Sequence, residues 1–479
     1  MNNHSEKNAL TKEILHRLYE LENILSVTIV GSYVDQKSLS SFSDIDTIVI
    51  CKKLSKINFE KCITAISSIS LEKLGINSSI KINSTFGPLK FDSKKNIVIH
   101  LMIYGLKEHQ DHVTSSPFTC LDWERSNCRL GKSLKNIFPT GRIQPRDFIE
   151  SRRGVSDYIE DLKSESISVR NYNFKNNIPI IEKKKHNLDK KHIGEFGFHI
   201  VRNLISNHLK LNSSDNRYFS NKEVSSEIKK RFPLNREHQK KFDLIAKIKS
   251  QGISKNYPKW TLAWIKKFTL DFDNEFIKHW ENVRTIHFIR HGKTFLNDNK
   301  FLGQGRDPKI QTSISPPLDF KFERVYTSPA RRCIETVKLV APLKETYQDV
   351  RLSEMNYGSA EGLTIEQVAQ KHPEFANKLA NGDDPKFPGG GENTKEVQLR
   401  LVDFLGDLIA SNSEKSLVVT HNVILRCLIG EHFGISSRLW YKIFIPHALP
   451  LEFLCLNGKL YPNIPRTELK IIFKDLVNN

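Results

Sequence analysis

The chain has 479 residues, of which 38% are hydrophobic and 27% charged, and its formal net charge at pH 7 is +19. This composition excludes a disordered or fibrous protein, and at about 100 to 200 residues per domain the length predicts roughly two to four domains. We find no apolar run long enough to span a membrane, and the opening MNNHSEKNALTKE lacks the apolar core of a secretion signal. We therefore expect a cytoplasmic protein without a membrane partner.

The positive charge favours polyanionic partners, because clustered Lys and Arg attract phosphates. Nucleic acid is a possible partner but not the favoured one, since Lys- and Asn-rich chains can be basic through genome composition alone. The seven cysteines are scattered and never spaced as CxxC, which predicts reduced thiols and no structural zinc site. The sequence does not indicate an oligomeric state.

Residues 1–143 have the pattern of a mixed α/β domain. A helical opening over residues 10–25 is followed by apolar runs at residues 27–30 (VTIV), 46–51 (DTIVIC) and 96–104 (NIVIHLMIY). Short strand-like runs that alternate with helices predict a sheet backed by helices.

Polar residues follow the first apolar run and begin the second. Gly31 and Ser32 come directly after VTIV, and their backbone amides and hydroxyl are suited to bind a triphosphate. Asp44 and Asp46 are two residues apart at the start of a strand, so their carboxylates project from the same face. Such a pair can hold Mg²⁺ for in-line nucleotidyl transfer.

The stretch GSYVDQKSLSSFSDID resembles the signature of the polymerase-β-like nucleotidyltransferase superfamily. The resemblance implies an NTP and Mg²⁺ as cofactors, Gly31 and Ser32 as nucleotide-binding residues, and Asp44 and Asp46 as metal ligands. The third carboxylate of the family is missing, because the later strand carries His100 at the expected position. Three alternatives stay open: His100 is a metal ligand or general base, Asp92 substitutes, or the domain binds nucleotide without turning it over.

Residues 144–280 predict an all-helical domain, with long helical patterns at residues 196–211 and 238–250. The charge run EKKKHNLDKKH at residues 182–192 predicts a solvated loop or helix face. Arg202, Asn203 and His208 resemble the arginine-polar-x4-histidine motif of HEPN domains, some of which are RNases paired with minimal nucleotidyltransferases. The resemblance implies an alternative function, a regulatory or defence module that acts on RNA or protein.

Residues 281–479 return to alternating strands and helices. The apolar strand TIHFI, residues 285–289, leads directly into Arg290-His291-Gly292. The carboxyl ends of the strands are where an α/β sheet places its active site. A neutral imidazole can attack phosphorus, while neighbouring guanidinium groups neutralise the phosphoryl oxygens.

Five blocks in this region resemble the histidine phosphatase superfamily, which includes the cofactor-dependent phosphoglycerate mutases. They are RHGKTFLNDNKFLGQGRD, YTSPARRCIETV, LSEMNYGSAEG, GGGENTKEVQLR and VVTHNVILR. The resemblance implies a three-layer α/β domain and no metal or cofactor. After the second histidine the family usually has two small residues, whereas this chain has Asn422 and Val423, which we expect to narrow the pocket.

The resemblance also implies roles for individual residues. His291 is the nucleophile, Glu354 protonates the leaving oxygen, and the phosphate pocket is formed by Arg290, Arg332 and His421. Substrate-binding residues are implied at Thr294, Asn297 and Gln304. The segment from His291 to Glu354 is compact, which favours hydrolysis over the second transfer of a mutase.

Together these patterns predict an α/β multidomain enzyme with a nucleotidyltransferase-like domain (1–143), a helical domain (144–280) and a histidine phosphatase domain (281–479). We expect a phosphorylated small molecule and an NTP as substrates. The alternative is the nucleotidyltransferase-HEPN module, in which the phosphatase reverses a modification. The natural phosphate ester, the acceptor and the preferred base are not indicated.

Overall fold

The computed structural model describes residues 3–35, 39, 44–86, 96–151, 161, 163–187, 190–213, 217–250, 257–280, 283–297, 299–311, 321–342 and 345–476. The chain forms two compact units. Unit 1 comprises Met1–Ile143 and Asp147–His279, and unit 2 comprises Gln144–Arg146 and Trp280–Asn479. The division of the chain into three domains stays a prediction.

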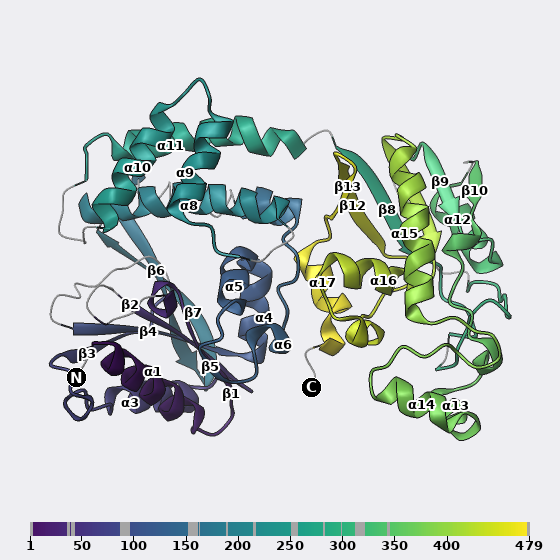
Figure 1. The fold of residues 1–479 in the computed structure, drawn as a ribbon, viewed down its shortest axis with the longest axis horizontal. Coiled ribbons are helices and arrows are strands. Elements are labelled where there is room, and N and C mark those ends of the chain that lie inside the picture. Colours follow the sequence, from purple (N-terminus) through teal and green to yellow (C-terminus); the bar gives the residue numbers. More distant parts are fainter. Residues whose placement is uncertain are drawn as a thin grey trace. The chain divides into compact units, whose positions relative to one another are not determined.

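The first part of unit 1 is built around a five-stranded mixed sheet with the strand order β3-β4-β2-β1-β5 (Figure 1). Each of the three predicted apolar runs is a strand, and the opening helix ends earlier than expected, at Tyr19. The elements are α1 (Asn3–Tyr19), β1 (Ile24–Val30), α2 (Ser32–Asp35), β2 (Asp44–Cys51), α3 (Lys56–Ser67), η2 (Glu72–Leu74), β3 (Ser79–Asn83), β4 (Asn96–Gly105), α4 (Leu106–Ser115), α5 (Pro117–Glu124), β5 (Arg129–Gly131) and α6 (Leu134–Ile137).

The two faces of this sheet differ in character. Side chains at alternate positions of β2 and β4, such as Ile45, Val49 and Ile99, pack into one core with α1 and α3. The intervening positions put Asp44, Asp46 and, on β4, His100 on the opposite face, because successive side chains of a strand alternate. The predicted polar site therefore lies on the face that α1 and α3 do not cover.

The prediction of an all-helical region from residue 144 to 280 is wrong for residues 166–187. These form a hairpin of β6 (Ser166–Lys175) and β7 (Ile178–Asn187). The turn is the pair Asn176 and Asn177, whose φ values of 50° and 63° are those of a two-residue type I′ turn. Apolar and polar residues alternate along β6, which suits a strand, and the charges of residues 182–187 lie on exposed β7 rather than on a loop or helix.

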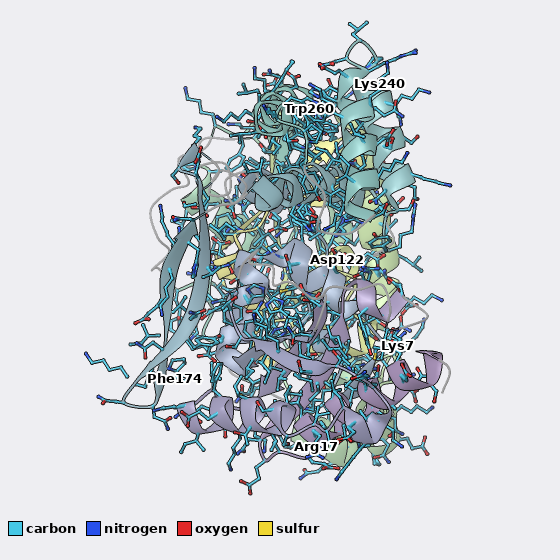
Figure 2. All side chains as sticks on the ribbon, turned by 90° about the vertical axis from the view of Figure 1, so that its left-hand side faces the viewer. Lys7, Arg17, Asp122, Phe174, Lys240 and Trp260 are labelled. Carbon is cyan, nitrogen blue, oxygen red and sulfur yellow. The ribbon has the colours of Figure 1, made fainter. Side chains whose placement is uncertain are left out.

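The hairpin packs onto the first part of unit 1 near its turn. Phe174 lies close to the end of the hairpin (Figure 2), with its ring centroid 5.5 Å from that of Phe59 on α3. A hydrogen bond also holds the turn itself, since the main-chain N–H of Lys56 donates to the side-chain oxygen of Asn177 at 2.8 Å. The described residues that follow form the helices α8 (Lys190–Asn212), α9 (Asn221–Arg231), α10 (Glu237–Ser250) and α11 (Thr261–Phe272), then the short π-helix η3 (Asp273–Ile277) and 3-10 helix η4 (Lys278–Trp280).

Unit 2 contains a six-stranded sheet with the order β10-β9-β11-β8-β12-β13. The first four strands are parallel, β12 pairs antiparallel with β8, and β13 pairs antiparallel with β12. The elements are β8 (Arg284–Arg290), β9 (Arg324–Thr327), α12 (Arg331–Val340), β10 (Thr346–Gln348), η5 (Val350–Leu352), η6 (Gly358–Ala360), α13 (Ile365–Lys371), α14 (Pro373–Ala380), α15 (Thr394–Ala410), β11 (Lys415–Thr420), α16 (Asn422–His432), η7 (Ser437–Lys442), β12 (Pro450–Leu456), β13 (Lys459–Pro462), α17 (Arg466–Ile472) and η8 (Lys474–Leu476).

Helices cover both faces of this sheet. On one face α12 packs through Cys333 and Val337 against a core that includes Ile289. On the other face Phe404 of α15 contacts Tyr326, and His432 of α16 contacts Phe453. Unit 2 is thus a three-layer α/β structure. In the described part of the chain we find no helix with the length and apolar character needed to cross a membrane.

Candidate active site

The neighbouring strands β8 and β11 bring the two predicted site histidines together. They run parallel with Arg290 paired to Thr420, and the main-chain N–H of His291 donates to the Thr420 carbonyl at 2.9 Å. His291 directly follows Arg290, and His421 directly follows Thr420. Because the two strands are parallel, both histidines lie at the same edge of the sheet. The centroids of their rings are 5.2 Å apart.

His291 is buried, and its main-chain contact fixes which ring nitrogen carries a proton. The residue is 2% exposed, and Nδ1 lies 2.8 Å from the carbonyl oxygen of Gly292. A carbonyl can only accept, so Nδ1 carries the proton and Nε2 keeps its lone pair. Burial, followed by the charges of Arg332 and Arg290, holds the pKa of His291 well below its usual value. The ring is therefore neutral at physiological pH.

His421 is fully buried beside His291. Its Nε2 lies 2.8 Å from the hydroxyl oxygen of Ser328 and 3.4 Å from the sulfur of Cys333. Burial, then the charge of Arg332, holds the pKa of His421 well below its usual value. This ring is also neutral. A hydroxyl group can both donate and accept, so the contact with Ser328 is compatible with either tautomer.

Two arginines, the half-buried Arg290 and the buried Arg332, supply the positive charge. The guanidinium of Arg332 donates to the carbonyl oxygens of Arg306 at 3.0 Å and Gly303 at 2.9 Å, and that of Arg290 donates to the Ile445 carbonyl at 2.8 Å. Burial lowers the pKa of Arg290 to about 10. Within the described residues, Nε of each arginine is buried and makes no hydrogen bond, and such donors suit an anionic oxygen.

Glu354 is held by main-chain donors at the start of α16. Its Oε1 accepts from Met355 at 2.9 Å and from Val423 at 3.2 Å, whereas among the described residues Oε2 accepts from Asn422 alone, at 3.1 Å. Oε2 thus retains a lone pair that can carry a proton. Asn422 and Val423, which differ from the small residues usual in the family, contribute here through their main-chain N–H groups, so side-chain size is not decisive for these contacts.

An ion pair of Arg400 and Glu392 supports the loop that carries Glu354. Arg400 Nε and Nη2 donate to the two oxygens of Glu392 at 2.9 and 3.1 Å. The same guanidinium donates to the carbonyl oxygens of Arg351 at 2.6 Å, Ser353 at 2.7 Å and Glu354 at 3.2 Å. A forked cation that bridges three carbonyls fixes the main chain on which the carboxyl group stands.

The three predicted substrate-binding residues have protein partners in this structure. The main-chain N–H and the hydroxyl of buried Thr294 both donate to Asn297 Oδ1 at 2.8 Å. Gln304 donates to the Glu354 carbonyl at 2.8 Å. These residues shape the loops around the histidines, and their contact with a substrate stays a prediction.

His447 belongs to the same cluster and was not predicted from the sequence. Its Nδ1 lies 2.8 Å from the His291 carbonyl oxygen, and the ring centroids of the two histidines are 5.4 Å apart. The segment IPHALP carries no motif. Only the antiparallel pairing of β12 with β8, which places Pro450 opposite Ile289, would have located it.

In unit 1 the predicted nucleotide-binding and metal residues lie close together. Gly31 has a φ of 77°, and a Cβ atom at this position would come within 2.6 Å of Asp46 Oδ2. Ser32 begins α2 directly after this turn. Asp44 is buried, whereas the side chain of Asp46 is 31% exposed. The arrangement can offer carboxylate oxygens beside a turn of main-chain amides.

His100 lies at the third ligand position and contacts Asp46. Its Nδ1 is 2.9 Å from Asp46 Oδ1, and its Nε2 is 2.7 Å from the Thr85 carbonyl oxygen. Nε2 therefore carries a proton, and both ring nitrogens are engaged with protein oxygens. Among the residues that the structure describes, no three His, Cys, Asp or Glu side chains form a metal cluster. Asp92 lies outside the described residues.

Arg202 and His208 have different partners in this structure. Arg202 donates to the Phe219 carbonyl at 2.8 Å and lies over the ring of Tyr218. His208 is buried, with Nε2 3.5 Å from Glu227 and its ring centroid 4.4 Å from that of Phe276. Each side chain packs into a different part of the helical region.

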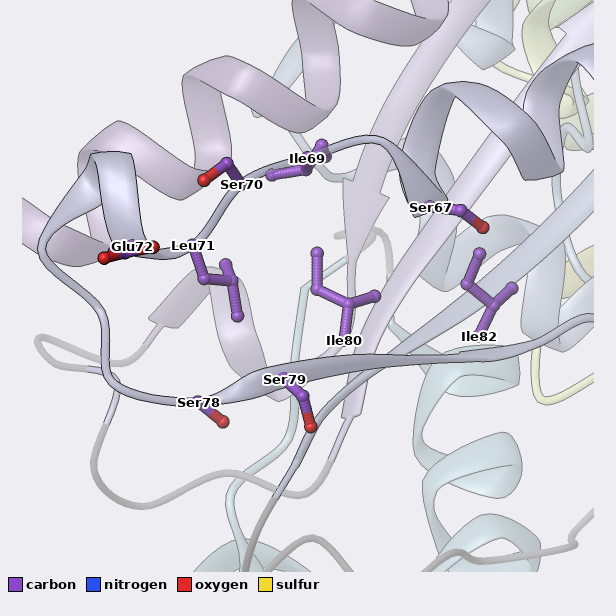
Figure 3. A pocket seen from close by; sticks show the side chains of 9 residues that line it. All are labelled: Ser67, Ile69, Ser70, Leu71, Glu72, Ser78, Ser79, Ile80 and Ile82. Atoms are coloured by element: carbon purple, nitrogen blue, oxygen red, sulfur yellow. The ribbon is translucent and has the colours of Figure 1, made fainter.

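A hollow of about 360 Å³ lies between the end of α3 and the edge strand β3 (Figure 3). Serine and isoleucine side chains line most of it, and Glu72 is its ionisable group. None of the predicted site residues lines this hollow, so we assign it no role in the chemistry.

Comparison with known proteins identifies the C-terminal part. Residues 317–452 match the model of the histidine phosphatase superfamily (branch 1). A 2,3-bisphosphoglycerate-dependent phosphoglycerate mutase of Buchnera aphidicola is 26% identical over 212 residues, which cover 35% of this chain and 92% of that protein. The metal-independent phosphoserine phosphatase of Arabidopsis thaliana is 28% identical over 178 residues, covering 33% of this chain and 75% of that protein.

Among solved structures, a phosphoserine phosphatase of Entamoeba histolytica aligns with a TM-score of 0.33 and 20% identity, covering 37% of this chain and 94% of that one. The C-terminal part of the chain contains a histidine phosphatase domain, by its match to the family model and to curated mutases and phosphatases.

Proposed function

We propose that the histidine phosphatase domain hydrolyses phosphate monoesters through a phosphohistidine intermediate on His291. The observation that carries this proposal is the neutral ring of His291, with Nδ1 protonated and Nε2 free to attack, beside Arg290 and Arg332. Two guanidinium groups match the charge of a phosphate dianion, and phosphoryl transfer depends mainly on positioning and such charge.

In the first step Nε2 of His291 forms a bond to phosphorus while the ester P–O bond breaks. The leaving oxygen takes a proton from Glu354, whose Oε2 has the lone pair not used by main-chain donors. His421 and the two arginines donate to the phosphoryl oxygens as charge shifts onto them.

In the second step a water molecule attacks the phosphohistidine. Glu354, now ionised, accepts a proton from this water, the N–P bond breaks, and inorganic phosphate leaves. The Nδ1–H bond to the Gly292 carbonyl keeps the same nitrogen available for the next cycle. Proton transfer by a positioned carboxyl group contributes typically about 10²- to 10⁴-fold to the rate.

The experiment that tests this function uses p-nitrophenyl phosphate and the full chain. His291→Ala should abolish phosphate release, and acid-labile ³²P labelling of the wild type should be lost in the variant. His432→Gln, which changes a histidine on α16 outside the cluster, is the matched control and should retain activity. Full activity of His291→Ala would refute the assignment. Transfer of phosphate to an added sugar acid in preference to water would show a mutase instead.

We also propose that the N-terminal part is a Mg²⁺-dependent nucleotidyltransferase that acts on an unknown acceptor. The close approach of Gly31 to Asp46, with Asp44 on the same strand, supports this proposal. Asp44 and Asp46 would hold Mg²⁺, which would neutralise the triphosphate, while Gly31 and Ser32 would bind it. The two carboxylates fit one ion; a second ion would need a ligand other than His100, whose nitrogens are engaged.

The test is pyrophosphate release from NTPs with Mg²⁺, in the wild type and in Asp46→Asn. Release that requires Asp46 supports a transferase. Binding of NTP without release supports the alternative of a domain that only senses nucleotide.

A further inference from the structure

The segment between η7 and β12 runs beside the nucleophile. Ala448, with a φ of 57°, donates its main-chain N–H to the Arg290 carbonyl at 3.0 Å. In return the Arg290 side chain donates to the Ile445 carbonyl at 2.8 Å. These two bonds on either side hold His447 at the level of His291.

The orientation of the His447 ring is set by its bond to His291. The carbonyl oxygen of His291 can only accept, so Nδ1 of His447 carries the proton. Burial, followed by the charges of Arg290 and Lys293, lowers the pKa of His447 to about 4. The ring is therefore neutral near pH 7, and Nε2 has a lone pair and makes no hydrogen bond within the described part of the chain.

This lone pair differs chemically from the two guanidinium groups and from the attacking nitrogen of the pocket. Arg290 and Arg332 can only donate, and the lone pair of His291 attacks phosphorus. An unprotonated nitrogen repels phosphoryl oxygens and attracts an O–H or N–H group. His447 Nε2 thus supplies a neutral acceptor beside a pocket for an anion, with its ring centroid 5.4 Å from that of the nucleophile.

We propose that His447 is a specificity-determining residue, whose Nε2 accepts a hydrogen bond from a hydroxyl or ammonium group on the alcohol part of the substrate. The inference rests on the proposed phosphatase function and narrows its substrate class. The preferred esters are phosphates of polyols, hydroxy acids or amino alcohols, rather than of simple alkyl or aryl alcohols.

The test compares two esters of similar size, glycerol 1-phosphate and n-propyl phosphate, in the wild type and in His447→Asn. The asparagine amide can still donate to the His291 carbonyl, but its side chain is shorter and places no acceptor at the position of Nε2. The wild type should favour glycerol 1-phosphate by about tenfold in kcat/KM, the value of one good hydrogen bond. In His447→Asn this preference should fall to about twofold, mainly through lower kcat/KM for glycerol 1-phosphate. His447→Ala, which removes both contacts, should lower kcat for both esters.

An unchanged preference in His447→Asn, or an equal loss for both esters, would overturn the proposal and leave His447 as a positioning residue only. So would a wild type without any preference, including for 2-aminoethyl phosphate over ethyl phosphate. Turnover of p-nitrophenyl phosphate by each variant separates these outcomes from failure of the phosphatase function, because that ester has no donor group for Nε2. A wild type inactive on all these esters would overturn both.

Discussion

The carboxyl group of Glu354 lies against the N-terminus of α16, where Val423 donates its main-chain N–H to Oε1 at 3.2 Å. This contact ties the proposed proton donor to the helix that begins directly after His421. The acid and the phosphate pocket therefore share one structural support.

Glu354→Gln should show the role of the carboxyl group through its dependence on the leaving group. The amide cannot deliver a proton, so kcat for an alkyl phosphate should fall by about 10²- to 10⁴-fold. The loss should be much smaller for p-nitrophenyl phosphate, whose leaving group needs little protonation. Glu361→Gln is the control, because Glu361 accepts from Gly303 N at 2.9 and 3.0 Å and braces a loop. Equal losses for both esters in Glu354→Gln would contradict the assignment.

Arg400→Lys should weaken both stability and turnover. Lysine cannot reproduce a fork that bonds Glu392 and three carbonyl oxygens. We expect a loss of about 1 to 3 kcal/mol in the free energy of unfolding, measured in urea, and a lower kcat with little change in KM. Arg351→Lys, in a more exposed network with Asp349 and Asp403, should cost below about 1 kcal/mol. Similar effects of the two changes would count against a special role for Arg400.

Two histidines of α4, the buried His109 and the half-buried His112, predict acid sensitivity of unit 1. Both ring nitrogens of His109, and Nε2 of His112, are buried without a hydrogen-bond partner among the described residues. Burial lowers the pKa of His109 to about 3 and that of His112 to about 4. Well above pH 6.5 both histidines are neutral in the folded and in the unfolded chain. As the pH falls below 6.5, protons bind to the unfolded chain first, so stability is lost down to the folded pKa values.

The measurement is the free energy of unfolding of unit 1 at pH 6.5 and pH 4.5, where each histidine should account for a loss of about 2 kcal/mol. His109→Leu should reduce the loss by that amount. His16→Leu, on the exposed side of α1, is the control and should leave the pH dependence as in the wild type. An identical pH dependence in His109→Leu would show that His109 is not buried in its neutral form.

Gly31→Ala should impair nucleotide binding without affecting the phosphatase. The left-handed φ of 77° costs a residue with a side chain about 1 to 2 kcal/mol. The new Cβ would also lie 2.6 Å from Asp46 Oδ2, so the carboxylate of Asp46 would have to move. Binding of NTP with Mg²⁺, followed by calorimetry, should weaken at least about tenfold. Gly458→Ala has the same backbone cost, with φ 72° and open space around it, and should bind NTP normally. Unchanged binding in Gly31→Ala would contradict a nucleotide site at this turn.

Local patterns were sufficient to place His291 at the end of a strand, because Arg290 and His291 directly follow an apolar run. The neighbourhood of His421 and Glu354 depends on pairing across more than 60 positions of sequence, and it was inferred from family resemblance rather than from spacing. His447 lies beside His291 only because β12 pairs with β8. A single histidine in a loop carries no pattern from which such a contact can be derived.

The hairpin β6–β7 was missed for a different reason. Its lysine-rich second strand has the composition of a solvated loop or helix face. The charge run therefore predicted no strand there, although polar and apolar residues alternate in the first strand. The Asn176-Asn177 pair was the informative signal, since asparagine tolerates the left-handed backbone that a two-residue turn needs. In unit 1 the sequence located the Gly31 turn and the aspartates, but it could not decide what His100 does.

The tripeptide Gln144–Arg146 belongs to unit 2, although the residues before and after it belong to unit 1. Gln144 accepts from the main-chain N–H of Ile464 at 2.8 Å, and Arg146 donates through Nε to the Asn463 carbonyl at 3.1 Å. On the ribosome this tripeptide emerges more than 300 residues before those partners. The hydrogen bonds of the tripeptide to residues 463 and 464 can therefore form only after nearly the whole chain has been synthesised.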